Sequence, residues 1–109
     1  MGLRQEIVNR MTSILGANKF IYGGYKSKPT LPYGNYARQE STNVFADNKT
    51  YQKINVYILR VVTDSKDFSL EEKVENMFDS LEIPYEAITD EDIKSEKAYC
   101  VEWMFSLCE

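Results

Sequence analysis

The spacing of apolar positions changes along the chain, and each spacing predicts an element. Residues 51–63, YQKINVYILRVVT, form the longest run rich in β-branched and aromatic residues, which predicts a strand inside a sheet and covered on both faces. Residues 97–109 alternate with period two, which predicts a closing strand. Its core face would carry Tyr99, Val101, Trp103, Phe105 and Leu107. Residues 3–15 show apolar positions at helical spacing and are followed by Gly16, a suitable helix C-cap.

A second helix is expected directly after the central strand. Ser69 and Glu72 have the spacing of a capping box, so we expect the helix to begin at Ser69 and to end before Pro84. Its apolar stripe consists of Leu70, Val74, Met77, Phe78 and Leu81. This spacing places the stripe against the sheet.

The remaining segments are shorter or more polar. Residues 20–22 predict a short extended piece, and residues 31–36 the start of a strand. Residues 37–50 are open to two interpretations, a long functional loop or a twisted hairpin arm that turns at 47–49. Residues 85–88 predict a short strand or extended arm, and residues 90–93 a turn or single helical turn.

These elements define an α+β fold for a single domain spanning residues 1–109. We expect a mostly antiparallel sheet of about four strands, flanked by an N-terminal and a central helix, with a long polar loop or hairpin arm. The chain has 109 residues, a length at which one core suffices. Its hydrophobic content is 43%, and no apolar run reaches the roughly 20 residues that span a bilayer, so a soluble protein is expected.

The composition offers few groups for catalysis or metal binding. Histidine is absent, and the two cysteines, Cys100 and Cys108, lie eight residues apart in one predicted strand, too far for a disulfide without a sharp bend. We expect both thiols to be reduced and structural. The acids at 90–92 lack the glycine and spacing of a calcium loop. The sequence therefore predicts no catalytic residue, no metal and no cofactor.

Charge is distributed unevenly along the chain. Residues 1–60 carry nine Lys and Arg against three acids, whereas residues 61–109 carry four Lys against fourteen acids. One interpretation is that the two halves interleave and neutralise each other within the molecule. The other is a protomer with a basic side and an acidic side, which favours head-to-tail association into a ring.

Several segments, taken in order, resemble the small tail-terminator or tail-completion proteins of long-tailed phages and prophages of Gram-positive bacteria. The resemblance rests on LPYGNY at 31–36, FADNKTYQKINVYILRVVT at 45–63, SLEEKVENMF at 69–78, IPYE at 83–86 and the segment at 96–99. It implies an α+β subunit of a hexameric ring. Such rings cap the tail tube, end its polymerisation and provide the surface on which the head docks.

The resemblance also implies partners and a location. The partners are other copies of the chain, the tail tube protein and the head–tail connector protein, with no membrane and no specific nucleic acid. The location is the tail or neck of the virion, and the host cytoplasm during assembly. No active site is implied. By length and polarity, the expected protein interface is the 37–50 segment, with Arg38, Gln39, Asn43, Phe45, Asp47, Asn48 and Lys49.

Two alternatives remain at this point. Another head–tail connector, such as a neck or head-completion protein, would share the size and ring symmetry. A nucleic-acid-binding module would use the basic first half together with Tyr22, Tyr25, Tyr33 and Tyr36, although the acidic second half opposes it.

Overall fold

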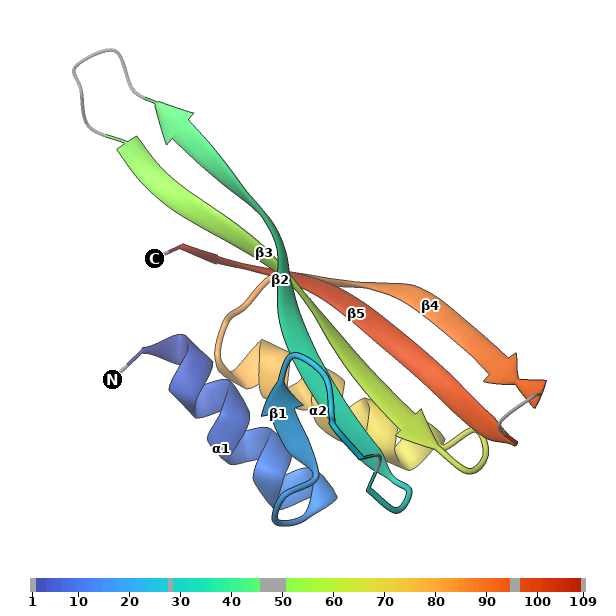
Figure 1. Ribbon diagram of the computed structural model, residues 1–109. Helices are drawn as coiled ribbons and strands as arrows, with labels where there is room; N and C mark the ends of the chain where they lie inside the picture. Colours follow the sequence, from blue (N-terminus) through green and yellow to red (C-terminus); the bar gives the residue numbers. More distant parts are fainter. Residues whose placement is uncertain (1, 28, 46–50, 95–96, 109) are drawn as a thin grey trace.

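The fold is a five-stranded sheet with two helices on one face, as the computed structural model shows (Figure 1). The structure describes residues 2–27, 29–45, 51–94 and 97–108, with the backbone alone for 40–45, 51–53 and 108. The elements are α1 (Leu3–Leu15), β1 (Phe20–Tyr22), β2 (Tyr33–Phe45), β3 (Tyr51–Thr63), α2 (Phe68–Ser80), β4 (Tyr85–Ile93) and β5 (Ala98–Cys108). The predicted α+β class is confirmed, with one strand more than expected.

The strands lie in the order β1-β2-β3-β5-β4, so the predicted central strand, β3, is indeed internal. The pair β1–β2 is parallel and the other three pairs are antiparallel. This order has a simple consequence for the chain. The N-terminal elements β1 and β2 form one side of the sheet, and the C-terminal elements β5 and β4 form the other.

The core lies between the helices and one face of the sheet. Alternate residues of β3 and β5 point into it, among them Tyr57, Leu59 and Trp103, which are at most 1% exposed. The helices contribute Ile7, Met11, Leu15, Leu70, Val74, Met77 and Phe78. Both predicted helical stripes and the aromatic face of the last strand are therefore confirmed.

The expectation that β3 is covered on both faces is wrong. Both helices pack on the face that carries Tyr57 and Leu59, and on the opposite face Val56 and Ile58 are only half-buried. Near the end of the strand, Val62 on this second face is 3% exposed without a helix above it. A continuous apolar run therefore did not require a second helical layer.

The N-cap of α2 lies two residues before the expected cap, Ser69, and the helix begins at Phe68. Asp67 is the N-cap, and its carboxylate accepts a hydrogen bond of 3.0 Å from the Leu70 backbone N–H. Ser69 lies inside the first turn and is exposed. The capping-box prediction is wrong because an aspartate two residues upstream satisfies the same type of backbone donor.

The described part of the 37–50 segment, residues 37–45, is one strand of a hairpin arm, as the second interpretation held. The strands β2 and β3 remain paired as far as Phe45 and Tyr51, and Figure 1 shows this arm reaching beyond the helices. A register shift between Arg38 and Glu40 marks a bulge in β2. The proposed turn, Asp47, Asn48 and Lys49, lies outside the described residues.

Residues 85–93 form a single strand, and the predicted turn at 90–93 is wrong. Asp90, Glu91 and Asp92 continue β4 and pair with Val101, Cys100 and Tyr99 of β5. A bulge between Ala87 and Thr89 interrupts the alternation of side chains. An edge strand next to solvent tolerates the carboxylates, which a central strand would not.

Candidate interaction surfaces

Four of the residues predicted to form the interface, Arg38, Gln39, Asn43 and Phe45, lie in β2, whereas Asp47, Asn48 and Lys49 lie outside the described residues. Arg38 and Gln39 are exposed, and the Arg38 backbone N–H donates to the Tyr22 hydroxyl at 3.2 Å. Asn43 and Phe45 belong to the paired part of β2, where the backbone alone is described. Two exposed residues of the prediction therefore lie together at the base of the arm, beside β1.

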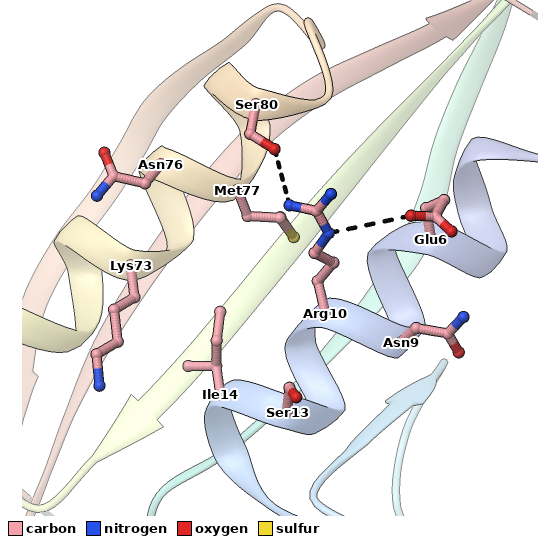
Figure 2. Close-up of a pocket in the computed structure, with 9 residues that line it drawn as sticks. All are labelled: Glu6, Asn9, Arg10, Ser13, Ile14, Lys73, Asn76, Met77 and Ser80. Atoms are coloured by element: carbon pink, nitrogen blue, oxygen red, sulfur yellow. Dashed lines mark hydrogen bonds and ion pairs between the residues drawn. The ribbon is translucent and has the colours of Figure 1, made fainter.

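A groove between the two helices has a volume of about 530 Å³ (Figure 2). Arg10 of α1 crosses it, and its Nη1 donates to the Ser80 hydroxyl of α2 at 2.7 Å. The Arg10 Nε lies 4.0 Å from a carboxylate oxygen of Glu6. Ile14 and Met77 form apolar parts of the lining. The hydrogen bond from Arg10 to Ser80 thus links α1 to α2 across the groove.

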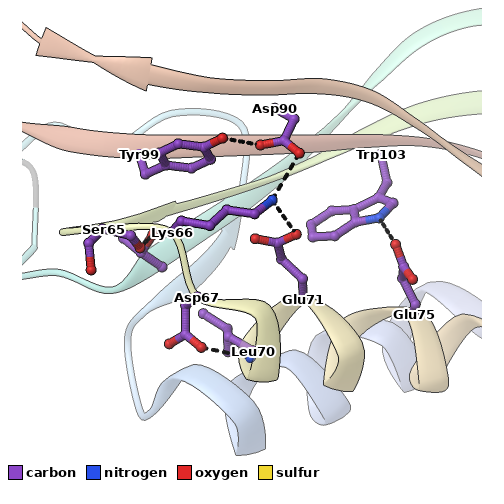
Figure 3. A network of polar contacts seen from close by, with 10 residues as sticks. Ser65, Lys66, Asp67, Leu70, Glu71, Glu75, Asp90, Tyr99 and Trp103 are labelled. Carbon is purple, nitrogen blue, oxygen red and sulfur yellow. Dashed lines mark hydrogen bonds and ion pairs between the residues drawn. The ribbon is translucent and has the colours of Figure 1, made fainter.

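A second polar cluster joins the start of α2 to the β4 side of the sheet (Figure 3). The Lys66 Nζ lies 2.8 Å from both the Glu71 and the Asp90 carboxylates. The Tyr99 hydroxyl donates to the other oxygen of Asp90. Close by, the Trp103 indole N–H donates to Glu75 at 3.0 Å. These contacts attach α2 to β4 and β5.

The protonation of this cluster follows from its contacts. Desolvation alone would lower the pKa of Lys66, but its hydrogen bonds to Asp90 and Glu71 raise that pKa well above its ordinary value. The hydrogen bonds from Lys66 and Tyr99 lower the pKa of Asp90. Lys66 is therefore held in its charged form and Asp90 in its ionised form. This arrangement suits a structural tether and leaves neither group as a proton donor or acceptor near pH 7.

Cys100 lies on the sheet face away from the helices. It is buried, 2% exposed and free, and it accepts a hydrogen bond of 3.1 Å from the Arg60 Nε. Burial raises the pKa of the Cys100 thiol despite the nearby guanidinium. A thiol that stays protonated is a poor nucleophile, so the expectation of a reduced, structural cysteine is confirmed for Cys100.

The tyrosines of the first half do not form an open surface for stacking bases. Tyr36 is 6% exposed and packs against Phe20, and Tyr25 and Tyr33 are half-buried against each other at a ring distance of 5.5 Å. Tyr22 is the exposed member of the set. One accessible ring is a weak platform for a nucleic acid, since such platforms stack successive bases on several rings.

The two outer edges of the sheet are chemically different. On the β4 edge, the strand carries Glu86, Asp90, Glu91 and Asp92 and no basic residue, and six of its nine residues are exposed. On the β1–β2 edge, residues 7–39 contain no acid. The three ion pairs described for this chain join residues of the same half, Arg10 with Glu6 and Lys66 with Glu71 and Asp90. The charge difference of the sequence therefore appears at the two outer edges, whereas in the middle of the sheet Arg60 of β3 lies opposite Glu102 of β5.

The sequence did not reveal the β4 edge as a surface. Its acids looked like a solvated turn, because aspartate and glutamate are poor strand formers and the bulge removed the period-two signal. The partly buried residues of β4 are Tyr85, Thr89 and Ile93, four positions apart. That spacing resembles neither a regular strand nor a complete helix.

Among the described residues, no group of three or more Cys, Asp or Glu side chains is placed to hold a metal ion. Over the same residues, neither helix has the length and apolar character needed to cross a membrane.

The class defined by these observations is an α+β domain with a mixed five-stranded sheet and two helices on one face. Eight chains of known structure match this fold. One belongs to a structure described as the virion of a native gene transfer agent (GTA) particle, with a TM-score of 0.54 and 9% identity. The match covers 95% of this chain and 89% of that chain. No protein-family model and no curated protein matches the sequence.

Proposed function

We propose that this protein is a structural subunit of a phage-type particle and carries out no catalysis. The observation that carries the proposal is the likeness to the GTA virion chain, which extends over nearly the full length of both chains. The surfaces agree with this role. The groove between the helices and the Lys66 cluster use their charged groups to join elements of the fold.

Within that class, we propose the role of a tail terminator. Copies of the chain form a closed ring, of about six subunits, that caps the tail tube, ends its polymerisation and offers a surface for the head. The proposal is supported by the order of sequence segments that resemble tail-terminator proteins and by the α+β fold those segments adopt. The partners are the tube protein and a head–tail connector, and the place of action is the tail or neck of the virion.

The first experiment tests self-association. Purified protein is measured by multi-angle light scattering across a concentration series and imaged by negative-stain microscopy. The expected result is a ring of about six subunits, free in solution or assembled on tail tubes. A protein that stays monomeric at every concentration and does not bind tubes would contradict the proposal.

The second experiment distinguishes the terminator from another neck protein. Deleting the gene of a terminator should give overlong tails without heads, because tube growth is no longer stopped. Deleting a head-completion protein should instead give leaky heads beside tails of normal length. Electron microscopy of the particles made by the deletion strain separates these outcomes, and a plasmid copy of the gene provides the control.

A further inference from the structure

We infer that the acidic β4 edge of one copy docks on the basic β1–β2 edge of the next copy. This inference rests on the proposed ring and specifies its contact surfaces. A ring needs two different surfaces on each subunit, related by a rotation that closes. The sheet offers such a pair, because β4 and β1 are its two outermost strands and lie on opposite sides of β3.

The β4 edge has the backbone and the side chains that such a contact needs. As an outermost strand, β4 pairs with β5 on one side, and its other side faces solvent. The outward N–H and C=O groups of an edge strand can pair with a strand from another chain. Ile88, 41% exposed at the bulge, adds an apolar contact among the acids. Glu86, Glu91 and Asp92 are exposed and are not members of the Lys66 cluster.

The opposite edge is complementary in charge. Lys19 precedes β1, Lys26 follows it, and Arg38 lies in β2 just beyond the end of the β1–β2 pairing. Lys26 and Arg38 are exposed, and Lys19 is oriented by hydrogen bonds to the carbonyls of Thr30 and Pro32 at 2.8 and 3.2 Å. The outer backbone of β2 is in contact with β1 and the Tyr22 hydroxyl up to Arg38. From Gln39 onward it extends past β1, so an incoming strand has room beside the arm.

Charge also selects the geometry of the contact. Two β4 edges would bring together Glu86, Glu91 and Asp92 of each copy, the acids that lie outside the Lys66 cluster, and two basic edges would repel each other in the same way. An edge with this excess of acids is therefore protected against pairing with itself and retains affinity for a basic edge. The contact that remains joins β4 of one copy to the β1–β2 edge of another, which is head-to-tail.

The test uses charge reversal with full-length protein. An acid-reversed variant carries Glu91→Lys and Asp92→Lys, and a base-reversed variant carries Lys26→Glu and Arg38→Glu. All four residues are exposed, so both variants should fold, which circular dichroism checks. A control variant with Glu72→Lys and Glu82→Lys has the same net charge as the acid-reversed variant, with the changes at exposed positions outside both edges.

Each reversed variant should associate at least about tenfold more weakly than the wild type in low salt, whereas the control variant should match the wild type. The two reversed variants mixed together should regain rings of wild-type mass. In that mixture every contact again joins a basic edge to an acidic edge. Amide hydrogen exchange should be slower in β4 of the assembled protein than in the acid-reversed protein alone.

The outcomes separate the inference from the proposed function. If both reversed variants form the same rings as the wild type, the edge contact is overturned and the ring proposal still stands. Recovery of dimers alone in the mixture would indicate a symmetric contact and would also overturn it. A wild-type protein that never self-associates, even on tail tubes, would overturn both. Loss of tube binding by the acid-reversed variant with its ring intact would assign β4 to the tube instead.

Discussion

Replacing Gly34 by alanine tests the tightest packing in the sheet. Gly34 lies in β2, between Phe20 of β1 and Val61 of β3. A Cβ atom at this position would lie 2.6 Å from the Arg60 carbonyl oxygen and 3.1 Å from a methyl carbon of Leu15. A comfortable carbon–oxygen contact is about 3.3 Å, so the methyl group is roughly 0.7 Å too close.

The cost should be high because the obstructing atom cannot move freely. The Arg60 carbonyl belongs to β3, which is paired on both sides. Overpacking costs about 1–3 kcal/mol, and a rigid backbone neighbour places this substitution near 3 kcal/mol. For 109 residues, an unfolding entropy of about 2.1 cal/mol/K per residue converts this cost into a fall in melting temperature of about 13 °C.

The assay is thermal and urea unfolding followed by circular dichroism, with Gly24→Ala as the matched control. A Cβ at Gly24 meets no atom within 4 Å, so this second glycine-to-alanine change should alter the unfolding free energy by no more than about 0.5 kcal/mol. Equal melting temperatures for the two variants would refute the crowding argument. The comparison removes the general effect of alanine on the unfolded chain, which both variants share.

Three further predictions concern single contacts. Asp67→Ala should lower the unfolding free energy by about 1 kcal/mol and Ser69→Ala by much less, because Asp67 caps α2. The measurement is urea unfolding, and equal losses in the two variants would support the capping-box interpretation instead. Glu75→Ala should lower the unfolding free energy by about 1–3 kcal/mol, because it leaves the buried indole N–H of Trp103 without its acceptor, whereas Glu75→Gln keeps an acceptor. The unfolding of both variants can be followed by tryptophan emission. Similar losses of stability in the two variants would refute the role of Glu75 as the acceptor. Because the pKa of Asp90 is lowered in the folded protein, its contribution to stability is complete above about pH 4 and is lost as the pH falls through that lowered pKa. Asp90→Asn should therefore be less stable than the wild type at pH 7 and equal to it in strong acid. A difference in stability that does not change with pH would contradict this prediction.

The elements predicted correctly are those whose side chains keep one period. In β5, Val101, Trp103 and Phe105 alternate with more polar residues and all point into the core. In α2, Val74 and Phe78 lie four residues apart on the buried stripe. Burial against one surface requires such regularity, so the sequence records it directly.

The elements predicted wrongly are those in which a local feature interrupts the period. The bulge in β4 at Ile88 shifts the following residues by one position, and the acids after it have low strand propensity. For α2, the observed cap, Asp67, lies two residues before the expected one, Ser69, and both residue types can cap a helix, so only the backbone geometry decides. Neither ambiguity can be resolved from one window of sequence.

The candidate interface could be predicted only in part. The charge difference between the two halves is visible in the sequence, but its meaning depends on the strand order. Because β5 inserts between β3 and β4, the acidic strand reaches the sheet edge opposite β1. That placement depends on long-range pairing, for example of Val61 with Val101, and not on any local pattern.

In the outer part of the described hairpin arm, β2 and β3 pair only with each other in the sheet. Asn43, Val44 and Phe45 pair with residues 51–53, whereas the pairing of β3 with β5 begins only at Ile54. Because successive side chains of a strand point to opposite faces, adding or removing two residues in each strand would preserve both the register and the facing of the arm. Its reach can therefore vary between related proteins in steps of about 7 Å without any adjustment of the body that carries it.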